Sequence, residues 1–401
     1  MDDWTNQSEG KDPVGRLFLP SLIISRFATQ PVSVILSLLL IEIGQSFGLP
    51  VGVTGQISTV RSSTAFVSSM LMGALSVRYK HKALLTTGLI FLSVATLGCS
   101  LSSSFFLLLS FYVMIGFGVA MIMPMTTSLV AKHLPLEKRT SAIGLLMATL
   151  SVSFLLGTPI IRFISDIGGW QLPYLVYAFP FPLLSLLLVF KGLPSESDSE
   201  KGSKSGGSLI AGYRGVLSNR SAIACLVSNA LAGATFSGLT VYSVSFYREH
   251  FLLSKGTATY FLVGAALIYT VGSLISSRFV IKLGRKQVTY LSALMTGVFT
   301  VIFTVIPVLW ISMVSALFAC LFAGIRSTAH VSLIVEQVPE FRGTIMSMSA
   351  AFVNLGTALG SGLGGLALLW YSYEAIGPTL GLFGLASAII VYLIAVDPTR
   401  A

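Results

Sequence analysis

The stretch LPSESDSEKGSKSGGS, residues 193–208, separates two long apolar parts of the chain. It is rich in Ser, Gly and charged residues of both signs, a composition typical of a flexible linker. Outside it the 401-residue chain is strongly apolar: 54% of all residues are hydrophobic, only 10% are charged, and the mean hydropathy is +0.86. Soluble domains average about 25% charged residues. The composition therefore indicates a protein that crosses a membrane many times, with this segment between two groups of spans.

The apolar runs are long enough to be transmembrane helices, which need roughly 20 apolar residues to cross the hydrocarbon core. Six runs precede the linker and six follow it. We therefore predict an all-α membrane protein with twelve transmembrane helices in two pseudo-symmetric six-helix bundles. The predicted spans are residues 17–44, 51–77, 83–101, 105–130, 140–164, 172–190, 221–246, 257–281, 287–306, 309–334, 344–370 and 376–396.

An internal repeat supports the division into two bundles. The basic segments VRYKHK (77–82) and IKLGRK (281–286) both follow an even-numbered span and lie 204 residues apart. Other matches at the same offset extend from the first loop to the fourth, and such self-similarity is a signature of duplicated units. We predict an N-terminal bundle at residues 1–190, a cytoplasmic linker at 191–218 and a C-terminal bundle at 219–401.

The basic residues are distributed unequally between the two sides of the predicted membrane. Nineteen of the 25 Lys and Arg residues lie in the terminal segments and in the loops after even-numbered spans, whereas the opposite side holds only Arg248 and Lys255. Cytoplasmic loops carry an excess of Lys and Arg. We therefore expect both termini in the cytoplasm and a multi-pass protein of the plasma membrane. Because the net charge of +10 is divided among short loops, it does not indicate binding to nucleic acid.

The two basic loops also carry a family resemblance, which extends over essentially the whole chain. Six plus six spans, a polar central linker and a basic loop after spans two and eight resemble the major facilitator superfamily of secondary transporters. The resemblance implies that its loop signature, which controls conformational change, falls on Gly73, Arg78, Lys282, Gly284 and Arg285. The acidic residue of that signature is absent in both copies, where Val77 and Ile281 stand. Gly157-Thr158-Pro159 is similar to a motif of the drug–proton antiporter branch, with one residue inserted.

The resemblance further implies that substrate binds between the two bundles, near the midplane. Four basic residues lie within predicted spans: Arg26, Arg61, Arg162 and Arg326. A charged side chain inside a membrane is costly and usually functional. Arg26 and Arg326 fall on spans one and ten, which line the cavity in this family, and each comes from a different half. No Asp or Glu lies at the centre of a span, so an anionic substrate would supply the missing counter-charge. Structural contacts with backbone carbonyls are the alternative.

Other polar residues in the spans are further candidates for contact with the substrate: Arg61, Tyr112, Asn229 and Tyr242. Arg61 is equally well explained by packing against backbone carbonyls. Arg162 lies near the end of span five and is interpreted as an interfacial residue that either extends toward the membrane surface or pairs with Asp166.

His330 lies one helical turn after Arg326 and is a candidate proton-coupling residue, because an imidazole can change charge near neutral pH. The alternative is a neutral histidine that binds a neighbouring helix. The repeat Gly356-x-x-x-Gly360-x-x-x-Gly364 predicts close helix packing.

These features predict a secondary active transporter that moves a small organic, anionic solute by alternating access. One alternative is a proton-coupled multidrug exporter of lipophilic compounds, and another is a receptor or sensor that does not transport. No catalytic, nucleotide-binding or metal-binding pattern is present, and the three cysteines form no framework, so we expect neither an enzyme nor a cofactor or metal. The expected partners are the solute, a proton or counter-anion, and membrane lipids, and we expect a monomer.

Overall fold

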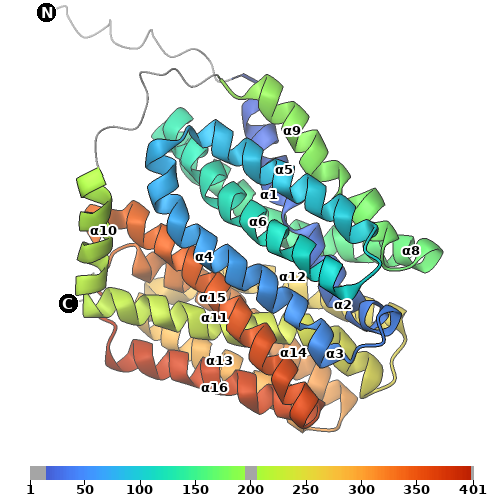
Figure 1. The fold of residues 1–401 in the computed structure, drawn as a ribbon. Coiled ribbons are helices and arrows are strands. Elements are labelled where there is room, and N and C mark those ends of the chain that lie inside the picture. The colour runs from blue at the N-terminus through green and yellow to red at the C-terminus, as the bar shows by residue number, and fades with distance from the viewer. Residues whose placement is uncertain (1–14, 195–205, 399–401) are drawn as a thin grey trace, which may run out of the picture.

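A computed structural model describes residues 15–194 and 206–398. The centre of the linker, residues 195–205, lies outside this range. The described residues fold almost entirely into helices, which lie in two layers of roughly parallel rods (Figure 1). The elements are α1 (Phe18–Ala28), α2 (Pro31–Ser46), α3 (Val51–Thr54), α4 (Gln56–Arg78), α5 (His81–Ser100), α6 (Phe105–His133), α7 (Leu136–Val152), the π-helical turn η1 (Ser153–Gly157), α8 (Thr158–Gly168), the π-helical turn η2 (Tyr174–Ala178), α9 (Pro180–Gly192), α10 (Gly206–Ser218), α11 (Arg220–Glu249), α12 (Lys255–Leu283), α13 (Arg285–Val305), α14 (Leu309–Ile334), the 3₁₀ turn η4 (Pro339–Phe341), α15 (Arg342–Trp370) and α16 (Tyr373–Leu393).

These helices match the predicted spans with three informative differences. Span one is divided into α1 and α2 at Thr29–Gln30, because Pro31 has no N–H to donate to the preceding turn. Spans five and six each contain a π-helical turn, η1 and η2. Eleven helical segments of the described chain are long and apolar enough to cross a membrane. The second span, α4, is not among them although it has 23 residues, since it contains Arg61 and several Ser and Thr residues.

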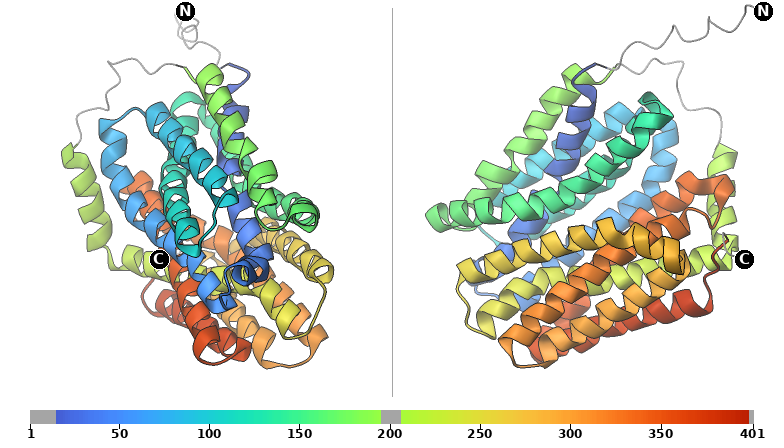
Figure 2. Two further views of the ribbon diagram at one scale, coloured as in Figure 1. Left: turned by 45° about the vertical axis from the view of Figure 1, so that its right-hand side comes forward. Right: turned by 180° about the vertical axis from the view of Figure 1, so that it is seen from behind.

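The helices form an N-terminal half, α1–α9, and a C-terminal half, α10–α16, which Figure 2 shows from two further directions. Within the first half α4 and α5 pack on α6, and α1 packs on α9; within the second, α13 packs on α14 and α16, and α11 packs on α15. Two seams join the halves. In one, α4 lies against α15 and α2 against α11; in the other, η1 and α8 lie against α12.

We call the end of the molecule where α1 and α11 begin and α9 and α16 end the terminal face. The opposite end, where α2 ends and α12 begins, is the far face. The helix α10 contacts both α4 and α15, and the Tyr213 hydroxyl donates to the carbonyl of Met70 across the halves at 3.4 Å. The helix α10, which falls within the predicted linker at 191–218, therefore touches both halves.

The glycine repeat on α15 is a site of close helix packing, as predicted. A Cβ atom at Gly356 would lie 2.1 Å from the carbonyl oxygen of Ala230, and one at Gly360 would lie 2.0 Å from that of Ala234. Only glycine allows the backbones of α15 and α11 to approach this closely. The glycine repeat thus brings α11 and α15 into close contact within the C-terminal half.

Candidate functional site

Arg26 lies near the end of α1, one turn before the break at Pro31, and its side chain is only 9% exposed. Its Nη1 donates to the carbonyl of Met123 on α6 at 2.9 Å, and its Nη2 contacts the Met147 sulfur on α7 at 3.8 Å. A guanidinium has five N–H donors, and among the described residues no carboxylate forms an ion pair with this one. Arg26 is therefore a buried cation with unused donors.

Arg326 lies on α14 and is 8% exposed. Both of its terminal nitrogens donate to the side-chain oxygen of Asn229 on α11, at 3.4 and 3.3 Å. Asn229 in turn donates to the Ser349 hydroxyl on α15 at 2.9 Å. These contacts orient the guanidinium within the C-terminal half, but they are long and involve one neutral acceptor. The described residues thus offer Arg326 no ion pair either.

His330 follows Arg326 by one helical turn and is 1% exposed. Neither ring nitrogen has a hydrogen-bond partner among the described residues. Leaving a buried polar group unsatisfied costs about 1–3 kcal/mol. One explanation given above was a neutral histidine that bonds to a neighbouring helix, and among the described residues no such bond is found. Both ring nitrogens are therefore available to a proton or a ligand.

A partly open cavity lies between the two halves, on the seam of η1 and α12, with about 530 Å³ of empty space that includes open solvent. One wall comes from the N-terminal half, at α7 and η1, and the others come from α11, α12 and α14. The lining is largely apolar, with hydroxyl groups from four side chains. The lining residues are Leu150, Ser151, Phe154, Phe236, Leu239, Thr240, Ser243, Phe261, Leu262, Ala265, Ala266, Tyr269 and Cys320.

Neither buried arginine lines this cavity, but the residues that both contact lie on its terminal-face side. Met147, which Arg26 contacts, lies one turn before Ser151 on the same face of α7. Asn229, which Arg326 contacts, lies two turns before Phe236 on the same face of α11, about 10 Å along the helix. The Tyr269 phenol stacks on Phe236 with ring centroids 5.0 Å apart. An apolar cavity thus lies between the halves, and one buried cation of each half lies on its terminal-face side, outside the lining.

The structure places the remaining predicted contact residues in hydrogen bonds away from the cavity lining. Arg61 donates to the Ser33 hydroxyl on α2 at 2.5 Å. The hydroxyl of Tyr112 is 2.6 Å from that of Tyr174, and both side chains are fully buried in the N-terminal half. Tyr242 donates to the Ser361 carbonyl at 2.6 Å.

The predicted conformational loops lie at the terminal face. Gly73 lies within α4 and Arg78 ends it, with the guanidinium 5.9 Å from the Tyr79 ring centroid. Lys282 lies in the last turn of α12. Gly284 joins α12 to α13 at φ +95°, a backbone conformation that favours glycine. One buried nitrogen of Arg285 has no hydrogen-bond partner among the described residues.

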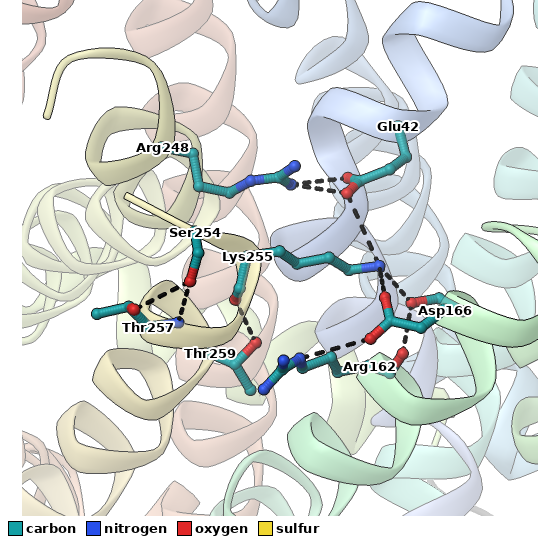
Figure 3. Close-up of polar contacts among 9 residues, drawn as sticks. Glu42, Arg162, Asp166, Arg248, Ser254, Lys255, Thr257 and Thr259 are labelled. Carbon is teal, nitrogen blue, oxygen red and sulfur yellow. Dashed lines mark hydrogen bonds and ion pairs between the residues drawn. The ribbon is translucent and has the colours of Figure 1, made fainter. Parts of the chain in front are cut away.

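An ion-pair cluster at the far face was not predicted from the sequence (Figure 3). Arg248, at the end of α11, donates to both carboxylate oxygens of Glu42 on α2, at 2.8 and 2.9 Å. Lys255, at the start of α12, lies 2.8 Å from Asp166 on α8 and 3.8 Å from Glu42. Arg162 pairs with Asp166 at 3.6 Å, as one of its two interpretations expected. Every pair except the last joins the two halves.

This far-face cluster, defined by Glu42, Arg162, Asp166, Arg248 and Lys255, had a signal in the sequence. Arg248 and Lys255 are the two basic residues of the loops on that side, and Glu42 and Asp166 are acids near span ends. All inter-half ion pairs found among residues 15–194 and 206–398 lie in this cluster. Charge attraction therefore holds the halves together at the far face.

Comparisons with known proteins agree with this architecture. The chain is 24% identical over 363 residues to a protein named probable sugar efflux transporter from Pasteurella multocida, covering 89% of this chain and 86% of that protein. It is 21% identical to the uncharacterized MFS-type transporter YwfA of Bacillus subtilis, covering 89% and 87%.

Solved structures share the fold at low sequence identity. A bacterial homologue of the human lysosomal transporter Spinster, in an inward-facing and unoccupied conformation, superposes with a TM-score of 0.70 at 16% identity, covering 96% of each chain. A D-xylose–proton symporter superposes with a TM-score of 0.75 at 13% identity, covering 94% of this chain and 97% of that one. The family model of the Major Facilitator Superfamily matches residues 22–268 and 229–401, and the chain therefore belongs to this superfamily of membrane transporters.

Proposed function

We propose that the protein is a secondary active transporter that moves a small organic anion by alternating access of a central site. The observation that supports this most is the pair of buried arginines, Arg26 and Arg326, which come from opposite halves and lie on the terminal-face side of the cavity between them. Neither has an acidic partner among the described residues. Because a buried cation without a counter-charge is costly, an anion that contacts both would stabilise the approach of the two halves.

In alternating access one side of the protein is closed while the other is open, and the far-face cluster can provide the closed side. Its inter-half pairs hold the far face closed, whereas the arginines lie on the terminal-face side of the cavity. By the excess of Lys and Arg in its loops, the terminal face is cytoplasmic. In this proposal both termini are cytoplasmic, the protein lies in the plasma membrane as a monomer, and the structure corresponds to a state closed toward the outside. The moving units are the predicted bundles, residues 1–190 and 219–401, joined by the linker at 191–218.

Coupling to a proton is assigned to His330. Its unpartnered nitrogens lie one helical turn from the positive charge of Arg326. An anion bound at Arg326 would offset that charge, so that substrate and proton would bind together. Exchange of one anion for another is the alternative that needs no proton.

Two other substrate classes have specific support. The names of relatives such as the Pasteurella multocida protein suggest efflux of a sugar, although only Ser151, Thr240, Ser243 and Tyr269 give the cavity hydroxyl groups. The apolar lining supports export of lipophilic compounds, in which case the arginines serve packing. A role as a receptor without transport would leave the far-face cluster permanently closed.

Transport assays separate these classes. Purified protein is reconstituted into liposomes, and the liposomes are loaded with a mixture of organic anions. Transport of a labelled anion, a labelled sugar and a labelled lipophilic cation is then measured. We expect anion flux that falls at least tenfold in Arg26→Ala and Arg326→Ala but not in Arg342→Ala, which removes an exposed arginine of the terminal face. Anion flux unchanged in both buried-arginine variants, or flux of sugar alone, would exclude the proposal.

A further inference from the structure

The lining of the cavity is largely apolar, and binding of the charged group of an anion does not account for such a lining. Small-molecule sites are lined mainly by hydrophobic and aromatic side chains with a few polar groups, and the lining of this cavity has that composition. Phe154, Phe236, Phe261 and Tyr269 contribute aromatic rings to its walls, and aliphatic or small side chains fill the rest. A ligand there gains free energy by removing apolar surface from water. The question is which part of which ligand would occupy it.

The arrangement of rings favours a flat apolar group. Phe236 and Tyr269 stack with an interplanar angle of 25°, and both line the cavity from neighbouring helices, α11 and α12. Phe154 faces them from the first turn of η1 in the other half. Aromatic rings pair well with one another in offset-stacked or edge-to-face geometry. An aryl group between these walls would contact both halves.

The charges fix how such a ligand would lie. Arg326 contacts Asn229, which lies two turns before Phe236 on α11. Arg26 contacts Met147, which lies one turn before Ser151 on α7, so both cations lie toward the terminal face from the cavity. A negative group would therefore lie at the terminal-face end of the cavity and the apolar group would extend toward the far face. The charge and the apolar surface are separated along one axis, which suits an amphipathic molecule better than a sugar or an inorganic anion.

We propose that the cavity between η1, α11, α12 and α14 is a subsite for the aryl group of the substrate, so that the transported class is aryl organic monoanions. This inference rests on the proposed function, because it assigns the charged group to Arg26 and Arg326. It adds a specificity site that the arginines alone do not imply. The hydrogen bond from Thr270 to Ser151, at 2.9 Å between α12 and α7, closes the edge of this subsite across the halves.

Equilibrium binding to the purified full chain tests the subsite with acetate, benzoate and 2-naphthoate as probes. We expect the wild type to bind 2-naphthoate at least tenfold more tightly than acetate. The variant Ala266→Phe fills the cavity from α12 and should lose that preference while acetate binding stays unchanged. Leu274→Phe, on the same helix at a position that is 73% exposed, is the matched control and should behave as the wild type.

A second variant protects the test against loss of folding. Phe236→Leu removes the ring that stacks on Tyr269 and should weaken 2-naphthoate more than cyclohexanecarboxylate, with a melting temperature that confirms the fold. Equal binding of acetate and 2-naphthoate by the wild type, or no change of preference in both variants, would overturn the subsite, as would a lipid acyl chain that occupies it in native mass spectra. Loss of discrimination between 2-naphthoate and uncharged 2-naphthalenemethanol would instead overturn the anion proposal and leave the aryl subsite intact.

Discussion

The substitution Glu42→Gln should shift the protein toward a state that is open at the far face. The carboxylate accepts two short bonds from Arg248 and lies 3.8 Å from Lys255, and the side chains of this cluster that contact it are only 18% exposed. Exposed ion pairs contribute about 0.2–1 kcal/mol and hydrogen bonds to charged groups about 1.5–3 kcal/mol. For this partly buried pair a loss of about 1–2 kcal/mol follows, which changes an equilibrium by about 5- to 30-fold.

Distances between spin labels measure this shift directly. Labels on cysteines placed at Leu101 and Tyr371, which are 69% and 79% exposed and lie on loops of opposite halves, report separation at the far face without disturbing the interior. The native cysteines are buried and would be replaced first. The control is Glu336→Gln, which removes an ion pair to Arg342 inside one half and should not change the distance. An unchanged distance distribution in Glu42→Gln would refute the assignment of the cluster to closure.

Three further substitutions test other parts of the structure. Gly360→Val should lower the melting temperature strongly or prevent folding, since a Cβ would lie 2.0 Å from the Ala234 carbonyl. Gly233→Ala, where the nearest atom is 3.7 Å away, should be tolerated. Equal stability of the two variants would contradict the α11–α15 contact. Gly256→Ala should displace the Arg162 guanidinium, which lies 2.6 Å from the position of the new Cβ. The population open at the far face should then increase in the same spin-label assay. A distance distribution identical to the wild type would speak against a role for Arg162 in closure. Tyr112→Phe should cost about 1–2 kcal/mol of stability, because it removes the bond to Tyr174, and leave the KM for anion transport unchanged; a raised KM with normal stability would make Tyr112 a substrate contact.

Much of the architecture could be predicted because lipid imposes simple rules on sequence. A span must be long and apolar, and loops of one side must be basic, so the helices and their alternation follow from the pattern. The exceptions are local. The break after Arg26 depends on Pro31, and α4 is more polar than a lipid-facing helix because much of its surface packs against α6 and α15.

The candidate site was accessible from sequence only where charge is rare. Arg26, Arg326 and His330 stand out because charged and titratable residues are costly inside a membrane. The cavity does not stand out, since Phe236 or Leu150 is the same type of residue that faces lipid elsewhere. The pairing of Glu42 with Arg248 joins positions 206 residues apart, and only the packing of α2 on α11 brings them together. The contact of the π-helical turn at Phe154 with α12 likewise joins segments far apart in the sequence.

The most direct test of the central claim is the affinity of the purified protein for an organic anion in Arg26→Gln, Arg326→Gln and the double variant. Because one anion is proposed to contact both side chains, each substitution should weaken binding at least tenfold, or about 1.4 kcal/mol, and the two losses should not be additive. Wild-type affinity in both single variants, with intact folding, would contradict the proposal that the two halves share one anion.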